Sequence, residues 1–140
     1  MKRAYLAILP ALIAATPAFA GADTKILDHH VANMKSGNLE AVLSDYAQDA
    51  VVVTPAGMVS PDGVFTGSET RKLFSVLTDK DHLPGNKTMQ VKYENVGPGT
   101  SIMRWVQFKG TPKEVSGYDV FVTRGDKIYF QVVTVNPAKK

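Results

Sequence analysis

The sequence contains no cysteine and one tryptophan, and after residue 20 no apolar run approaches the length of a membrane-spanning helix. Because disulfide bonds are excluded, the fold must rest on its hydrophobic core. A domain of about 120 residues can do this, since it buries around two-thirds of the surface of its unfolded chain. We therefore expect one small domain with an apolar core.

The sequence also lacks a strong excess of charge of either sign. It has 16 basic and 13 acidic residues, and 14 basic residues remain without Lys2 and Arg3, which belong to the segment described next. The basic residues are scattered, with the densest spots at Arg71-Lys72 and Lys139-Lys140. Nucleic-acid binding requires a clustered basic surface. Nucleic acid is therefore not an expected partner.

Residues 1–20 have the three parts of a signal peptide. A basic start (Lys2-Arg3) precedes an apolar stretch from Ala4 to Ala15 and the small-x-small sequence Ala18-Phe19-Ala20. We expect cleavage after Ala20 and export of the domain at 21–140 to the periplasm or the medium. The apolar stretch is shorter than the ~20 residues that a membrane-spanning helix needs, so we expect no membrane anchor.

The first half of the exported part has mostly helical spacing. Apolar residues at helical intervals predict a helix over Thr24 to Ser36, which Gly37 ends. Asn38 is a suitable N-cap for a second helix, predicted to end near Gln48-Asp49. Thr66 and Glu69 have the spacing of a capping box and predict a third helix, over Ser68 to Asp79.

Strands account for the rest. Ala50 to Thr54 is rich in β-branched residues and is followed by a long turn, Pro55 to Gly63. Four antiparallel strands are predicted in the last third of the chain: one around Met89 to Tyr93, then Ser101 to Lys109, Glu114 to Arg124 and Lys127 to Val135. The last of these has apolar residues on both faces. We therefore expect it to be central in the sheet or at an interface.

Three segments, in this order and at this spacing, resemble the nuclear-transport-factor-two-like superfamily, and its SnoaL-like and ketosteroid-isomerase-like branch most closely: Gly37 to Val53, Phe65 to Glu69 and Tyr118 to Ile128. The resemblance implies an α+β fold. A cone-shaped, mostly antiparallel mixed sheet would wrap around the N-terminal helices, as in a cystatin-like roll. It also implies a pocket for small apolar molecules and a homodimer formed through the sheet. Function varies widely among proteins with this fold, so the fold alone does not decide it.

The ketosteroid isomerase branch implies roles for particular positions. Alignment on Gly37 to Ala41 places His30 and Asp119 where that branch has its two oxyanion-binding residues. The same alignment places Thr54 where that branch has its catalytic base. An unactivated hydroxyl cannot act as a general base near neutral pH, which argues against ketosteroid isomerase chemistry.

The residues themselves also favour His30 and Asp119 as the catalytic candidates. His30 lies on the apolar face of the first helix, and Asp119 alternates with Gly117 and Phe121 on one face of a strand. If both faces point into the pocket, the two side chains could meet as a general acid and base. The alternative for His30 is a buried residue bonded to backbone. The alternative for Asp119 is a structural residue, paired with a surface cation or accepting backbone bonds.

Several aromatic residues are candidates for ligand contact or for plain core packing. Trp105 is the best candidate for a pocket wall, because it offers a large apolar surface and a single donor. The further ligand-binding candidates are Tyr46, Phe74, Tyr93 and Thr54. His29 and His30 point about 100° apart on a helix and cannot hold one metal ion. We expect no metal and no cofactor.

Two functions follow as hypotheses. The first is a pocket that binds a small hydrophobic molecule or catalyses a cofactor-free proton transfer, such as isomerisation, cyclisation or elimination. The second is a non-catalytic dimerisation or protein-interaction domain that uses an open apolar sheet face around Val132, Val133 and Val135. A cavity lined by His30 and Asp119 favours the first hypothesis. A cone filled by side chains such as Trp105 favours the second.

Overall fold

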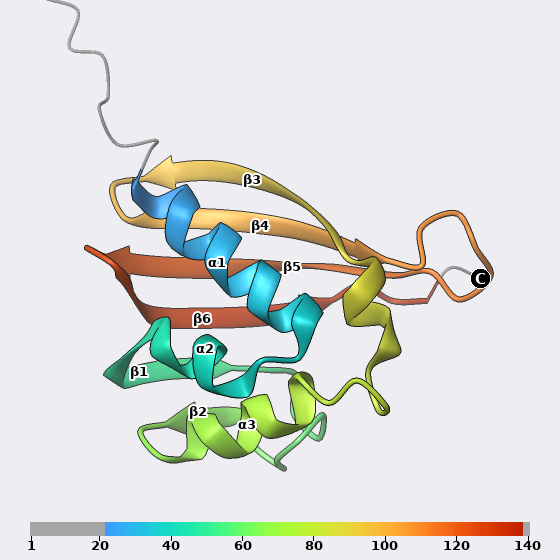
Figure 1. Ribbon diagram of the computed structural model, residues 1–140, viewed down its shortest axis with the longest axis horizontal. Coiled ribbons are helices and arrows are strands. Elements are labelled where there is room, and N and C mark those ends of the chain that lie inside the picture. Colours follow the sequence, from blue (N-terminus) through green and yellow to red (C-terminus); the bar gives the residue numbers. More distant parts are fainter. Residues whose placement is uncertain (1–21, 139–140) are drawn as a thin grey trace, which may run out of the picture.

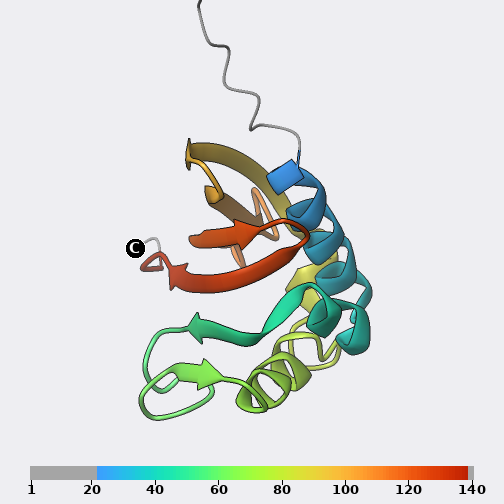
Figure 2. The same cartoon turned by 90° about the vertical axis from the view of Figure 1, so that its left-hand side faces the viewer.

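A curved sheet covered on one face by helices makes up the computed structural model, which describes residues 22–138 (Figure 1). The predicted signal peptide therefore lies outside the described residues. Seen from the side, the strands bend around the helices, which all lie on the concave face of the sheet (Figure 2). No helix within residues 22–138 is long and apolar enough to cross a lipid bilayer.

The sheet has six strands in the order β2-β1-β6-β5-β4-β3. The strands are β1 (Tyr46–Val53), β2 (Val64–Thr66), β3 (Gln90–Gly97), β4 (Thr100–Gln107), β5 (Val115–Arg124) and β6 (Lys127–Val135). β1 and β6 run parallel, and every other neighbouring pair is antiparallel. The predicted α+β class with a mixed, mostly antiparallel sheet is thus confirmed, as is the central position of the last strand.

The helices are α1 (Ala22–Ser36), α2 (Leu39–Ser44), α3 (Glu69–Leu77) and a short 3₁₀ helix η1 (Pro84–Thr88). The predicted N-cap is confirmed, because the side chain of Asn38 accepts the backbone N–H of Ala41 at 3.2 Å. The predicted capping box is wrong. Thr66 lies in β2, and Ser68, which precedes α3, makes no side-chain cap bond.

The second helix ends earlier than predicted. It stops at Ser44, and the chain enters β1 at Tyr46, which pairs with Ile128 of β6. The apolar spacing that suggested a longer helix is met instead by strand alternation, with Tyr46, Ala50 and Val52 buried. The conformation at Tyr46 is determined by pairing with Ile128, far along the chain, and not by the local helix propensity.

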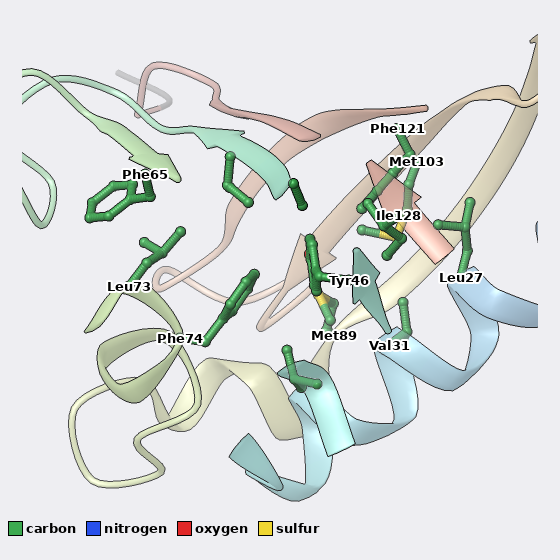
Figure 3. Close-up of a cluster of buried hydrophobic side chains, with 13 residues drawn as sticks. Leu27, Val31, Tyr46, Phe65, Leu73, Phe74, Met89, Met103, Phe121 and Ile128 are labelled. Atoms are coloured by element: carbon green, nitrogen blue, oxygen red, sulfur yellow. The ribbon is translucent and has the colours of Figure 1, made fainter. Parts of the chain in front are cut away.

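The core lies between the helices and the concave face of the sheet (Figure 3). Its members are Leu27, Val31, Val42, Tyr46, Ala50, Val52, Phe65, Leu73, Phe74, Met89, Met103, Phe121 and Ile128. They come from all three α-helices and from five of the six strands, with Met89 at the end of η1. This core holds both walls of the cavity described below.

Strand alternation assigns β5 and β6 side chains to opposite faces of the sheet. Gly117, Asp119 and Phe121 pair with Val135, Val133 and Gln131, and all of these face the helices. The alternate residues Val120 and Val132 pair with each other on the outer face, where no helix lies. β6 is therefore apolar on both sides because it serves two different surfaces.

Gly117 makes room for the indole of Trp105, its cross-strand partner on β4. A Cβ at position 117 would lie 2.5 Å from Trp105 Cζ2, and it would also overlap the backbone oxygen of Thr134. No side chain fits in that space. Glycine at this point lets the indole pack against β5.

Gly117→Ala is expected to lower the free energy of unfolding by about 1–3 kcal/mol, because the added methyl group must displace the indole or the β6 backbone. Trp105 is the single tryptophan, so its fluorescence should report the displacement as a shift to longer wavelength. Gly97→Ala is the matched control, since nothing lies within 4 Å of a Cβ there. Unchanged stability and emission in Gly117→Ala would contradict the packing described.

Candidate functional site

A cavity of about 310 Å³ lies between the helices and the concave face of the sheet. Its walls come from α1, α3 and η1, from the loop after β1, and from β4, β5 and β6. Its polar lining residues are His30, Asn86, Gln107, Asp119 and Gln131. The other lining residues are apolar, apart from the indole N–H of Trp105. The cone is not filled by large side chains: Trp105, Phe74 and Met58 line its wall.

Methionine is concentrated around this cavity. The four methionines other than Met1 (Met34, Met58, Met89 and Met103) all line it. Thioether side chains are flexible and polarizable and adapt to the shape of a bound molecule. Met58, Val76 and Val115 are each 41% exposed. These three form an apolar rim where the cavity opens to solvent.

A hydrogen-bonded chain of four side chains holds Asp119 on the cavity wall. The indole N–H of Trp105 donates to Asp119 Oδ1, and Nε2 of Gln131 donates to Asp119 Oδ2, both at 2.8 Å. The hydroxyl of Tyr46 donates to Gln131 Oε1 at 2.5 Å. Both oxygens of the carboxylate therefore accept a hydrogen bond from a neighbouring side chain.

Burial raises the pKa of Asp119 to about 6, and the hydrogen bonds from Trp105 and Gln131 limit that rise. The side chain is only 5% exposed, so little water screens its charge. A carboxyl group with a pKa this close to neutrality can both take up and release a proton at physiological pH.

His30 is the other ionisable residue of the cavity. It is 3% exposed, and its ring makes edge contacts with Tyr46, Phe74 and Phe121, with ring centroids 5.6–6.1 Å apart. Burial lowers the pKa of His30 to about 4, and the neighbouring His29 contributes to the decrease. The imidazole is therefore neutral at physiological pH.

His30 and Asp119 line the same cavity, but they are not hydrogen-bonded to each other. Trp105 and Gln131 occupy the carboxylate of Asp119. The Nδ1 atom of His30 points instead toward Asp45, with Oδ2 4.0 Å away. The two residues are thus separate groups, His30 on the helical side of the cavity and Asp119 on the sheet side, and burial dominates the pKa of each.

Sequence reasoning missed Asp45 and Gln131. Asp45 is 2% exposed and ends α2, a position that the predicted longer helix concealed. Gln131 interrupts the apolar run of the last strand, and a single amide at a buried strand position is a signal that could have found it. Asn86 and Gln107 also line the cavity, joined by a 2.9 Å hydrogen bond.

The predicted ligand-binding residues separate into three groups. Trp105 and Phe74 line the cavity, whereas Tyr46 lies behind Gln131 and reaches the wall through its hydrogen bond. The structure does not place Thr54 or Tyr93 on the cavity wall. Thr54 directs its hydroxyl to the backbone of the turn that ends at Gly63. Tyr93 packs at the edge of the core, where burial and the nearby Asp28 raise its pKa.

Within residues 22–138 no three histidine, aspartate or glutamate side chains are grouped so that they could hold a metal ion. His29 and His30 both approach Asp45, but from different sides of α1.

The sequence matches no protein-family model and no curated protein. Solved structures match it over most of its length. They include an NTF2-like protein of unknown function from Burkholderia xenovorans LB400, with a TM-score of 0.61, 16% identity and coverage of 84% of this chain and 85% of that one. A SnoaL-like protein of unknown function from Burkholderia thailandensis E264 has a TM-score of 0.60 and 17% identity, with coverage of 87% and 98%.

A third similar structure is TerC crystallised with polyporic acid, with a TM-score of 0.59, 16% identity and coverage of 81% of this chain and 91% of that one. At these identities the likeness concerns the fold. The chain has the NTF2-like fold, as its sequence resemblance predicted.

The raised pKa of Asp119 predicts how stability depends on pH. Because the folded pKa of about 6 exceeds the ordinary value of 3.8, this group's contribution is complete below pH 3.8 and is lost as the pH rises through 6. Asp119→Asn has no carboxyl group at this position, so it does not lose stability in this way as the pH rises. The free energy of unfolding of wild type relative to Asp119→Asn should therefore fall by roughly 3 kcal/mol between pH 3.5 and pH 7.5.

Urea unfolding of both proteins across this pH range measures the difference between their free energies of unfolding. His30 is present in both proteins, so its contribution cancels from that difference. Asp126→Asn, in the exposed turn between β5 and β6, is the control for the loss of one negative charge. A difference between wild type and Asp119→Asn that is independent of pH would contradict the raised pKa.

Proposed function

We propose that this domain binds a small, mostly apolar organic molecule in its cavity and moves a proton on that molecule without a cofactor. The observation that carries the proposal is a buried carboxylate, Asp119, on the wall of a mostly apolar cavity of about 310 Å³. Burial of a carboxyl group is unfavourable unless its oxygens are hydrogen-bonded, and here Trp105 and Gln131 donate to them. A buried carboxyl group with a raised pKa on a cavity wall is characteristic of functional sites.

The dimensions and lining of the cavity support binding of a small molecule. Its volume falls in the range of pockets that hold small organic ligands, about 300–1,000 Å³. The adaptable methionine wall and the exposed apolar rim favour an apolar ligand. TerC, which shares the fold, was crystallised with the small molecule polyporic acid, and this favours a similar use of the cavity here.

Asp119 is the group that would carry the proton. As a carboxylate it removes a proton from a carbon of the ligand, whose electron pair passes into an adjacent unsaturated system. As the acid it returns the proton to the same or another carbon, which results in exchange or isomerisation. A pKa of about 6 allows both half-reactions near neutral pH.

A second function, assembly of two copies through the sheet, is favoured by the outer face. Half-buried apolar side chains from four adjacent strands meet there: Val51, Val53, Ile102, Val120, Val122, Phe130 and Val132. These side chains carry no charge that would select a different partner, so we propose a second copy of the chain. Val133 and Val135, considered earlier for this surface, line the cavity instead.

Binding and proton transfer can be tested together with 2-naphthol, a bicyclic molecule whose C1–H exchanges through its keto tautomer. Addition of 2-naphthol should shift the NMR signal of the single indole N–H, which belongs to Trp105. In D₂O the protein should speed the incorporation of deuterium at C1. Asp119→Asn should slow this protein-dependent exchange by about 100-fold or more while binding persists.

Val133→Phe places a larger side chain beside Asp119 and should abolish both binding and exchange. Val96→Phe is the matched control, because Val96 is 51% exposed in β3 and lies off the cavity, and it should change neither. If the wild type binds 2-naphthol but does not speed the exchange, the proposed proton transfer is wrong and only the proposed binding remains. Binding that survives Val133→Phe would place the ligand elsewhere and overturn the proposal.

The dimer predicts a definite change in molecular mass. Val132→Glu puts a charge in the middle of the outer face, and desolvation of that charge should convert a dimer to a monomer at tens of micromolar. Light scattering measures the mass, and Val96→Glu adds the same charge outside the patch as the control. A wild-type protein that is already monomeric at this concentration would remove the idea.

A further inference from the structure

We propose that Asp45 sets the tautomer of His30, so that Nε2 faces the cavity as a hydrogen-bond acceptor, and that the ligand is therefore a neutral molecule with a hydroxyl group. This rests on the proposed use of the cavity for a small molecule and adds the chemical class of that molecule. Asp45 acts here as a positioning residue, because it reaches the cavity only through His30.

Two buried polar atoms, one from His30 and one from Asp45, face each other. His30 Nδ1 and Asp45 Oδ2 are both fully buried, and neither has a hydrogen-bond partner within the described residues. The two atoms are 4.0 Å apart, and their side chains are 4% and 2% exposed. The distance between the two atoms is somewhat beyond that of a hydrogen bond, so the contact between them is electrostatic.

Electrostatics selects the tautomer at this distance. In a poorly screened interior, an N–H dipole directed at a carboxylate oxygen is attractive, whereas a nitrogen lone pair directed at it is repulsive. The proton of the neutral imidazole therefore belongs on Nδ1, facing Asp45. The other ring nitrogen, Nε2, keeps its lone pair.

Asp45 is held in place from two directions. His29 donates from Nδ1 to Asp45 Oδ1 at 2.6 Å, and Nε2 of His29 accepts from Asn33 Nδ2 at 3.3 Å. The backbone oxygen of Asp45 accepts the N–H of Ile128 on β6 at 2.8 Å. These bonds leave Oδ2 as the carboxylate oxygen turned toward His30.

The polar atoms of the cavity then determine what a ligand must offer. Asp119, Gln131, Asn86 and Gln107 are all hydrogen-bonded to other side chains. His30 is the cavity-lining polar side chain for which the described residues provide no hydrogen bond. With Nε2 as an acceptor, the complementary ligand group is a donor such as a hydroxyl. A ligand carboxylate offers no proton and would be repelled by Asp119.

The tautomer is measurable in the free protein by ¹⁵N NMR of the histidine rings. There are three histidines, and His30→Met identifies the signals of His30. In the wild type at pH 7, Nδ1 of His30 should be the protonated nitrogen and Nε2 the unprotonated one. Asp45→Asn offers an amide donor to Nδ1 and should shift the ring toward the Nε2–H tautomer. Asp28→Asn, an exposed residue of the same helix, removes the same charge and should leave the tautomer unchanged.

Calorimetry then compares three ligands of similar shape. Wild type should bind 2-naphthol roughly 3- to 10-fold more tightly than 2-methoxynaphthalene, which keeps the oxygen but cannot donate, and 2-naphthoate should bind most weakly. His30→Met and Asp45→Asn should each remove the preference for the hydroxyl. Asp28→Asn should retain it.

The outcomes separate the two proposals. A wild-type His30 protonated on Nε2 would overturn this inference even if every ligand binds. An equal affinity for 2-naphthol and 2-methoxynaphthalene would also overturn it and would leave the proposed cavity function intact. If no ligand binds, the proposed function fails, and the hydroxyl-bearing ligand fails with it. Should Asp45→Asn not fold, the wild-type tautomer and His30→Met still decide the matter.

Discussion

The structure depends on the burial of one carboxylate, Asp119, in a mostly apolar cone. Burial of an ionisable group this deep requires donors for both oxygens, and two strands supply them, Trp105 from β4 and Gln131 from β6. Each donor has its own requirement. The indole of Trp105 fits because residue 117 has no side chain, and Gln131 is oriented by the hydroxyl of Tyr46. The sequence therefore has four specialised residues around one acid.

The two ionisable groups of the cavity have pKa values in the reverse of their usual order. Burial raises the pKa of Asp119 to about 6 and lowers that of His30 to about 4. The depressed pKa of His30 costs stability as the pH falls from 6.5 toward 4, while the raised pKa of Asp119 costs stability as it rises from 3.8 toward 6. The two effects offset each other over the same window. Between these limits both groups are largely neutral, so the cavity is closest to an uncharged apolar pocket in mildly acidic solution.

Periodicity alone located the first helix, the four strands of the last third of the chain and the faces of His30 and Asp119. Periodicity failed where contacts between distant parts of the chain determine the local conformation. The β1 strand begins at Tyr46 because β6 pairs with it, and no local pattern shows that pairing. Because the second helix was predicted to be too long, the role of Asp45 as a neighbour of His30 was also missed. Thr54 and Tyr93 were assigned to the pocket by alignment and by residue type, and neither signal reports the direction in which a side chain points.

Strand alternation on β6 explains how one fold supports a pocket and an assembly surface together. Val133 faces Asp119 and the cavity, while the adjacent Val132 lies on the outer face of the same strand. The strand is central in the sheet and hydrogen-bonded on both sides, so its two faces are fixed relative to each other. A one-residue slip of its register would exchange the two sets of side chains and remove Gln131 from Asp119. The bond between Gln131 and Asp119 thus does two things: it satisfies the buried acid, and it holds the register that keeps the polar wall inside the cone.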